Sequence, residues 1–182
     1  MKKIYSSVLM AILAMLMLTA CVKDEPSGGD VKVIVKVGDR LPQFTVTTDV
    51  GTEVSKQTLA GAPSVIVFFD TECGDCRRAL PEVQKAFVSF ISSSASPVYL
   101  PRLITISRAE GADKIASYWK ENQLILPYSA QNDRGVYNLF AGSGIPLIFI
   151  SDATTTVRTV FGPDDKITSS AILDAINAAY LR

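Results

Sequence analysis

The sequence predicts an α/β domain in which a mixed central sheet is flanked by helices. After residue 30, short apolar runs typical of strands alternate with segments that have a helical period. Residues 64–69 (SVIVFF) are almost continuously apolar, which favours a central strand buried on both faces. The length of 182 residues suits one domain of ordinary size.

The composition excludes several classes of function. The 18 Lys and Arg residues balance 18 Asp and Glu residues, whereas nucleic-acid binding normally needs a basic excess. The sequence has no histidine, which removes His-based triads, His-ligated metals and His general bases. Its three cysteines are too few for a four-cysteine zinc site. We therefore expect no metal, no cofactor and no nucleic-acid partner.

Residues 1–20 have the pattern of a targeting segment. A basic start precedes the apolar run Val8–Leu18, which is too short to span a bilayer and suits a signal-peptide core. The run ends in Leu-Thr-Ala-Cys21, which resembles the lipobox of bacterial lipoproteins, where the cysteine becomes the acylated first residue. The alternative is an ordinary signal peptide followed by a chance cysteine. We expect a lipoprotein signal peptide over residues 1–20.

Residues 21–30 are expected to be the acylated cysteine and a flexible tether. Residues 22–30 are polar, rich in Gly, Ser and Pro, and lack an apolar period. The acidic stretch at residues 23–25 resembles a short export signal of surface-displayed lipoproteins, although a plain solvated tether fits equally well. The expected location is the bacterial cell envelope, lipid-anchored, most simply at the outer membrane and facing the periplasm or the surface.

The first elements of the domain, residues 31–182, are expected to be extended. Residues 31–37 are β-branched and partly alternating, which favours a strand or an extended lead-in. Residues 44–48 form the next strand, and a turn at 49–51 leads back into residues 52–54. Residues 55–59 suit one helical turn before the central strand.

A helical period follows the central strand. Apolar residues recur at spacings of three or four on one helix face, at Cys76, Leu80, Val83, Phe87 and Phe90. Pro81 lies inside this pattern and is expected to kink the helix.

The second half continues the alternation of strands and helices. We expect a strand at 103–106, a helix at 113–122, a short helix at 133–140, and strands at 147–150 and 155–160 joined by a tight turn at Ser151-Asp152. Thr168 is expected to cap a last helix that has Ile172, Ile176 and Ala179 on one face. The predicted order is β-β-β-α-β-α-α-β-β-α.

Cys73 and Cys76 form a Cys-Gly-Asp-Cys motif between the central strand and the long helix. At a helix N-terminus, unpaired N–H groups and the helix dipole favour a thiolate at Cys73. Cys76 lies one turn further, on the core-facing side, near enough to form a disulfide. The alternatives are a static disulfide, which would close too short a loop to stabilise much, and half of a metal site that lacks partners. We expect redox chemistry.

From about Val37 to the C-terminus, the chain resembles the thioredoxin superfamily and, within it, the TlpA/ResA-like membrane-tethered thiol-disulfide oxidoreductases. The residues that carry the resemblance are Gly38–Phe44, the strand and motif over 65–77, Leu80-Pro81, Gly144-Ile145-Pro146, Asp152 and Gly162-Pro163. The resemblance implies a thioredoxin-like fold, catalysis by Cys73 and Cys76, and a redox disulfide between them. It also implies that Pro146 is cis and that Ile145, Pro146 and Glu72 contact the substrate.

Some residues depart from the family pattern. Glu72 stands where most relatives have Trp, and Val67 replaces the buried acid of many thioredoxins. Gly-Asp lies between the cysteines, and Gly61-Ala62 replaces a Gly-Lys pair. Three carboxylates, Asp70, Glu72 and Asp75, are expected to offset most of the thiolate stabilisation at Cys73, whereas Arg77 and Arg78 would oppose them or serve only as a solvated face.

The favoured function is an envelope thiol-disulfide oxidoreductase, most simply a monomeric reductant. Its partners would be protein thiols and disulfides, an electron donor of the envelope, and the membrane through the lipid anchor. One alternative is a non-catalytic binding or assembly lipoprotein with the same fold. A peroxide-reducing relative would need Thr three residues before its cysteine, where Asp70 precedes Cys73. Copper delivery would need a Cys-x-x-x-Cys motif and a histidine.

Overall fold

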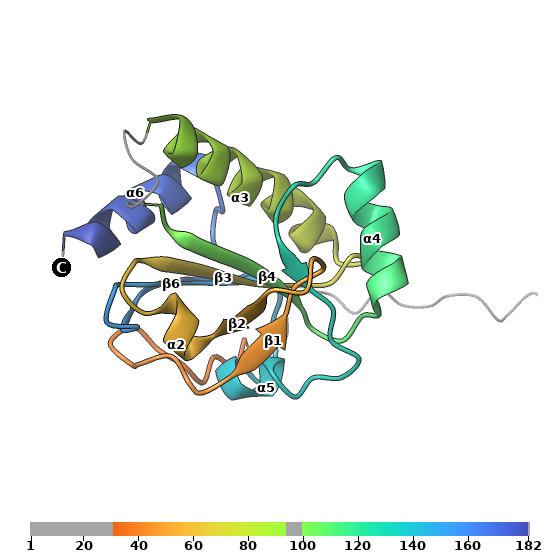
Figure 1. Ribbon diagram of the computed structural model, residues 1–182, viewed down its shortest axis with the longest axis horizontal. Helices are drawn as coiled ribbons and strands as arrows, with labels where there is room; N and C mark the ends of the chain where they lie inside the picture. The colour runs from red at the N-terminus through yellow and green to blue at the C-terminus, as the bar shows by residue number, and fades with distance from the viewer. Residues whose placement is uncertain (1–30, 94–99, 182) are drawn as a thin grey trace, which may run out of the picture.

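The computed structural model describes residues 31–93 and 100–181, and the predicted signal peptide and tether lie outside these residues. The chain forms a five-stranded mixed sheet in the order β5-β4-β3-β6-β7 and a separate hairpin of β1 and β2 (Figure 1). The elements are β1 Thr45–Thr47, β2 Glu53–Ser55, α2 Lys56–Leu59, β3 Ser64–Phe69, α3 Gly74–Ser93, β4 Arg102–Ser107, α4 Ala112–Glu121, β5 Tyr128–Ser129, α5 Tyr137–Phe140, β6 Leu147–Ser151, β7 Val157–Phe161 and α6 Ser169–Tyr180. The predicted mixed sheet with flanking helices is confirmed.

The central strand β3 organises the layers of the fold. All six of its residues are buried, and it pairs in parallel with β4 and antiparallel with β6. Figure 1 shows α3 and α6 above the sheet, and the β1–β2 hairpin with α2 and α5 below it. A continuous apolar strand must be covered on both faces. Each of its large apolar side chains left exposed would lose about 1.5–3 kcal/mol of hydrophobic stabilisation.

The long helix α3 carries the predicted apolar face. Cys76, Leu80 and Val83 are buried on it, together with Ala79 and Ala86. The helix is continuous through Pro81. Its last turns pack against α6, where the Phe90 and Tyr180 rings stack with centroids 5.6 Å apart. The apolar stripe predicted from the sequence therefore connects the Cys-Gly-Asp-Cys motif to the C-terminal helix.

Two predicted elements differ in the structure, and a third takes one of its two predicted forms. Residues 31–37, predicted as a strand or an extended lead-in, form no strand and make one isolated bridge, between Val33 and Ala141. The helix predicted at 133–140 is only α5, because the Asp133 carboxylate accepts the Gly135 N–H at 2.7 Å in a preceding turn. The turn expected at Ser151-Asp152 begins one residue later, since Ser151 still pairs with Val157.

Strand β5 was not predicted from the sequence. Its two residues, Tyr128 and Ser129, are too few to give a period, and they pair in parallel with β4 at the edge of the sheet. The cap predicted at Thr168 is confirmed, since its side chain accepts the Ala171 N–H. Within residues 31–93 and 100–181, no helix combines the length and apolar character that crossing a bilayer requires.

The connection between β6 and β7 is built around the buried carboxylate of Asp152. One carboxylate oxygen accepts hydrogen bonds from the Thr154 N–H, the Thr154 hydroxyl and the Thr156 N–H, at 2.7–3.1 Å. The other oxygen accepts the Arg158 Nε–H at 2.7 Å. Burial by itself raises the pKa of this carboxyl, but the hydrogen bonds outweigh burial and hold the pKa below its ordinary value.

Replacing Asp152 with Asn should lower the free energy of unfolding at pH 7 by about 1–3 kcal/mol, because hydrogen bonds to a charged group are lost. A carboxyl whose pKa is depressed in the folded state stabilises above its unfolded pKa, about 3.9. That stabilisation is lost as the pH falls through the folded pKa. Urea unfolding of both proteins from pH 7 to pH 2.5 should therefore show the two stabilities converging in acid. A constant difference across this range would contradict the account.

Candidate functional site

Cys73 lies between the end of β3 and the first residue of α3. Its sulfur accepts the Cys76 backbone N–H at 3.3 Å, an N–H that the helix itself leaves unpaired. Cys73 is partly exposed, whereas Cys76 is completely buried against the core, and both thiols are free. The motif therefore presents one accessible sulfur and one shielded sulfur.

The pKa values of the two thiols are shifted in opposite directions. A side-chain hydrogen bond from Cys76 and the backbone N–H groups of Cys76 and Asp75 lower the pKa of Cys73 to about 6, although burial and the Asp75 charge oppose them. Burial, followed by the hydrogen bond to Cys73 and its charge, raises the pKa of Cys76 far above its ordinary value. At neutral pH Cys73 is the thiolate and Cys76 its hydrogen-bond donor.

The loop before β6 lies against the accessible sulfur. The Cys73 thiol group is 3.7 Å from the Ile145 carbonyl oxygen, and the Ile145–Pro146 peptide bond is cis, as the resemblance implied. Both residues are buried. The Tyr137 hydroxyl donates to the Gly144 carbonyl at 2.7 Å and so fixes the loop from α5. The partly exposed Cys73 sulfur and the Ile145 backbone carbonyl therefore lie side by side.

The three acidic residues around the motif are each paired with a cation. Asp70 lies 3.2 Å from the Arg108 guanidinium, Glu72 lies 2.8 Å from the Lys114 ammonium, and Asp75 pairs with Arg78. Among the three, only Asp75 figures among the main influences that raise the pKa of Cys73. The expectation that these acids would cancel most of the thiolate stabilisation is therefore wrong, because only the Asp75 charge has a clear effect and the hydrogen bonds to the sulfur outweigh it.

The two arginines after the motif do not contact the thiol either. Arg77 donates its Nε–H to the Thr71 carbonyl at 2.6 Å, and its guanidinium lies 5.9 Å from the centre of the Tyr118 ring. Arg78 is exposed and holds Asp75. Arg77 therefore fixes the loop that precedes Cys73, and Arg78 screens a carboxylate.

Glu110 is the site residue that the sequence analysis missed. Its buried carboxylate accepts both the N–H and the hydroxyl of Thr71 at 2.7 Å, and Lys114 lies 2.8 Å away. Glu110 and Glu72 together raise the pKa of Lys114. The Arg108 backbone N–H also donates to the Phe69 carbonyl at 2.8 Å, which further ties this loop to the end of β3. The loop from β4 thus holds the residues that lead into Cys73.

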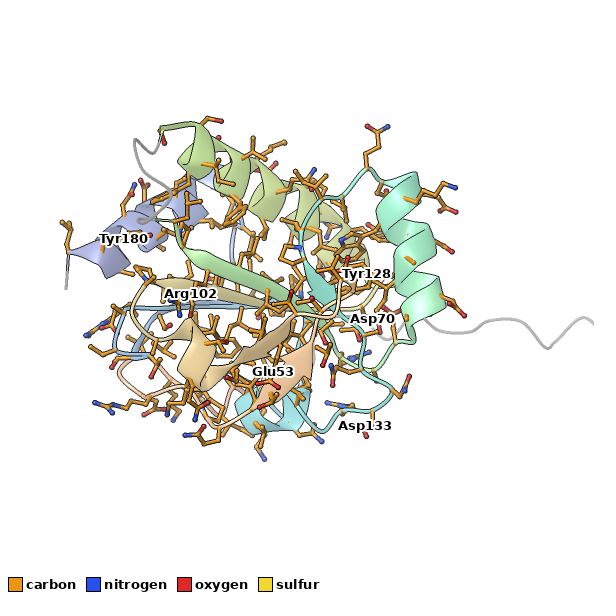
Figure 2. All side chains as sticks on the ribbon, in the orientation of Figure 1. Glu53, Asp70, Arg102, Tyr128, Asp133 and Tyr180 are labelled. Carbon is orange, nitrogen blue, oxygen red and sulfur yellow. The ribbon has the colours of Figure 1, made fainter. Side chains whose placement is uncertain are left out.

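A sequence signal for Glu110 existed. It stands just after β4, which runs parallel to β3, and the carboxyl ends of parallel neighbours meet at one edge of the sheet. Figure 2 shows Asp70 at this edge, beside α4, with Arg102 at the opposite end of the sheet. Within the ranges 31–93 and 100–181, no group of three or more Cys, Asp or Glu side chains could hold a metal ion.

Comparison with known families and structures agrees with this geometry. The sequence model of the AhpC/TSA family matches residues 37–162. No curated protein sequence matches the chain.

Several solved structures share the fold. A candidate protein disulfide isomerase from Bacteroides thetaiotaomicron superposes with a TM-score of 0.73 at 21% identity, over 84% of this chain and 94% of that one. A thioredoxin-family thiol:disulfide interchange protein from Chlorobium tepidum gives 0.64 at 21% identity, over 79% and 97%. A secreted thiol-disulfide isomerase from Corynebacterium glutamicum gives 0.66 at 18% identity, over 85% and 93%. The fold is therefore thioredoxin-like.

Replacing Glu110 with Gln should raise the pKa of Cys73 above about 6. The neutral amide loses the charge-assisted bonds to Thr71 and the ion pair with Lys114, so the loop before Cys73 is held less firmly and the sulfur moves relative to the Cys76 N–H. The pH dependence of iodoacetamide alkylation measures this pKa. Glu121→Gln, at the exposed last residue of α4, is a matched exchange that should leave it unchanged. If Glu110→Gln lowers stability to urea without moving the alkylation midpoint, the residue only supports the fold.

Proposed function

Because the chain belongs to the AhpC/TSA family, we propose that it is a thiol-disulfide oxidoreductase that exchanges disulfides with protein substrates. The observation that carries this proposal is the asymmetry of the Cys-Gly-Asp-Cys motif. A partly exposed thiol with a pKa of about 6 lies over a buried thiol whose pKa is raised. Names such as thiol:disulfide interchange protein among the structural neighbours support the same reaction.

The reaction uses the two cysteines in sequence. The Cys73 thiolate attacks one sulfur of a substrate disulfide, which forms a mixed disulfide and releases the other substrate sulfur as a thiol. Cys76 then gives up its proton and attacks the Cys73 sulfur. The second substrate thiol leaves, and Cys73 and Cys76 become a disulfide. The substrate gains two electrons, which an electron donor of the envelope must return to the protein.

The substrate would lie across Cys73 and the Ile145-Pro146 loop. The Ile145 carbonyl, 3.7 Å from the thiol group, is a backbone acceptor for an extended polypeptide. The Glu72 side chain, 74% exposed, stands directly before Cys73 and would contact the same chain. Ile145, Pro146 and Glu72 are thus the proposed substrate-binding residues, with Asp70, Asp75, Arg77 and Arg78 around them.

The acidity of Cys73 favours a reductant over a strong oxidase. A pKa of about 6 is nearer to the value of about 7 in thioredoxin than to about 3.5 in DsbA. A strongly stabilised thiolate would stabilise the reduced protein and make its disulfide a strong oxidant. The moderate shift at Cys73 therefore supports donation of electrons to substrates.

The proposed location is the bacterial envelope, with Cys21 as the lipid-modified residue after a signal peptide of residues 1–20. The lipobox-like residues before Cys21 support this location, and two structural neighbours are described as secreted. The domain is proposed to act as a monomer, without a cofactor.

Two other functions have weaker support. A peroxide-reducing site would need Thr three residues before its cysteine, a position held here by Asp70, which pairs with Arg108. A non-catalytic binding module would not need a thiol whose pKa is lowered to about 6. Reduction of insulin disulfides by the mature chain separates catalysis from simple binding.

Cys76→Ser should accumulate mixed disulfides with envelope proteins, because Cys73 still attacks but nothing resolves the product. Cys73→Ser should accumulate none, because the remaining thiol is buried and its pKa is raised. Non-reducing electrophoresis of cells that express each variant measures the adducts. The double variant gives the background. Equal trapping by both single variants, or by neither, would refute this division of roles.

The midpoint potential should lie nearer to −270 mV than to −120 mV, the thioredoxin and DsbA ends of the scale. A glutathione titration followed by fluorescence of Trp119, the one tryptophan of the sequence, measures it. Asp75→Asn removes a charge that raises the pKa of Cys73, so it should shift the midpoint upward by roughly 10–20 mV. Asp174→Asn, on the exposed part of α6, is the control. A midpoint near −120 mV would rule out the reductant role.

A further inference from the structure

The first described residues pair with the loop that leads to the active site. Val33 bridges Ala141, and the Gly142 N–H donates to the Lys32 carbonyl at 2.7 Å. The Lys32 N–H donates to the Ser143 hydroxyl at 3.0 Å, and the Phe140 carbonyl accepts further N–H groups from the lead-in. Residues 31–35 are therefore fixed along residues 140–144.

Val31 brings the start of the domain next to Cys73. A Cβ atom built on Gly144 would lie only 2.6 Å from Cγ1 of Val31, so the two residues are in direct contact. The next residue, Ile145, has its carbonyl oxygen 3.7 Å from the Cys73 thiol group. With about 3.8 Å between neighbouring Cα atoms, Val31 lies within about 15 Å of the reactive sulfur.

The opposite pole of the domain is far from the site. Helix α3 begins beside Cys73 and contains 20 residues, which extend about 30 Å. At its far end Phe90 stacks on Tyr180, near the C-terminus of the chain. Figure 1 shows this end of α3 and the C-terminus on one side of the molecule, away from α4 and the start of α3.

The distance to the proposed lipid is short. Val31 follows Cys21 by ten residues, which can span at most about 35 Å. That reach is about the diameter of the domain itself, for which a radius of gyration of about 15 Å is expected. A tether of this length therefore keeps the end of the domain that contains Val31 nearer to the bilayer than the opposite end.

We propose that the tether enters the domain on its active-site face, so that the anchored protein turns Cys73 toward the membrane and acts on disulfides attached to that same membrane. This rests on the proposed activity and lipid anchor. The substrate class is cystine-containing segments of membrane-bound or lipid-anchored polypeptides, held within about 50 Å of the lipid headgroups. The anchor would not speed reaction with proteins free in solution, because it does not raise their concentration near Cys73.

The test compares two sulfurs on the full lipidated chain in vesicles. One variant, Cys76→Ser, keeps Cys73 as the reactive thiol. The other combines Cys73→Ser and Cys76→Ser with Ser92→Cys, an exposed position about 28 Å along α3 from Cys73. Each is mixed with a pyridyl disulfide, either soluble or carried on a lipid headgroup of the same vesicles. Pyridinethione release gives the ratio of the lipid-bound rate to the soluble rate, which cancels the intrinsic reactivity of each thiol.

The ratio should be roughly tenfold higher for Cys73 than for the thiol at position 92. A spacer of twenty Gly and Ser residues between Asp30 and Val31 should bring the two ratios together. Equal ratios without the spacer, or a higher ratio at position 92, would overturn the proposed orientation. Two further results would overturn it through its premises and are distinguishable. In the first, Cys73 fails to react even with the soluble probe, which refutes the redox site. In the second, Cys21→Ser leaves vesicle binding unchanged, which refutes the anchor.

Discussion

The site depends on the hydrogen bond from the Cys76 backbone N–H to the Cys73 sulfur at the start of α3. A helix must leave its first N–H groups unpaired, and here a sulfur takes the place that a Ser or Asp oxygen usually has. The same helix turn directs Cys76 into the core. This helix turn thus brings the Cys76 side chain and N–H to the Cys73 sulfur, which lowers the pKa of the outer thiol, and buries the inner thiol, which raises its pKa. Strand β3, buried on both faces, fixes where this turn occurs.

Charges near the motif act on the loop more than on the sulfur. Arg77 and Glu110 together bond the carbonyl, the N–H and the hydroxyl of Thr71, two positions before Cys73. Lys114 joins Glu110 to Glu72 and so ties α4 to the same loop. The rigidity of this loop, rather than the net charge around the thiol, is what the acidic and basic residues of the site provide.

The features that could be predicted from the sequence are those with a period or a fixed local chemistry. Strand β3, the apolar stripe of α3, and the cap at Thr168 each follow from a pattern within a few residues. The cis peptide at Pro146 came only from the family resemblance.

Features that depend on pairing across the fold could not be predicted in the same way. Strand β5 has two residues, and the clamp on Thr71 joins residues 39 positions apart. The carboxylates were misjudged for the same reason. Asp70 meets Arg108 only because β3 and β4 end at the same edge, so a count of nearby charges along the chain overestimated how far these acids raise the pKa of Cys73.

The complete lack of histidine has a consequence for how the protein responds to its surroundings. Most proteins change their charge between pH 5 and 8 through imidazole groups scattered over the surface. In this chain that class of group is missing, and the Cys73 thiol, with its pKa of about 6, titrates in the same interval. Mild acidification therefore protonates the nucleophile while imidazoles contribute nothing to the charge of the remaining surface. The reactivity of the motif in this pH interval therefore depends on the protonation of Cys73.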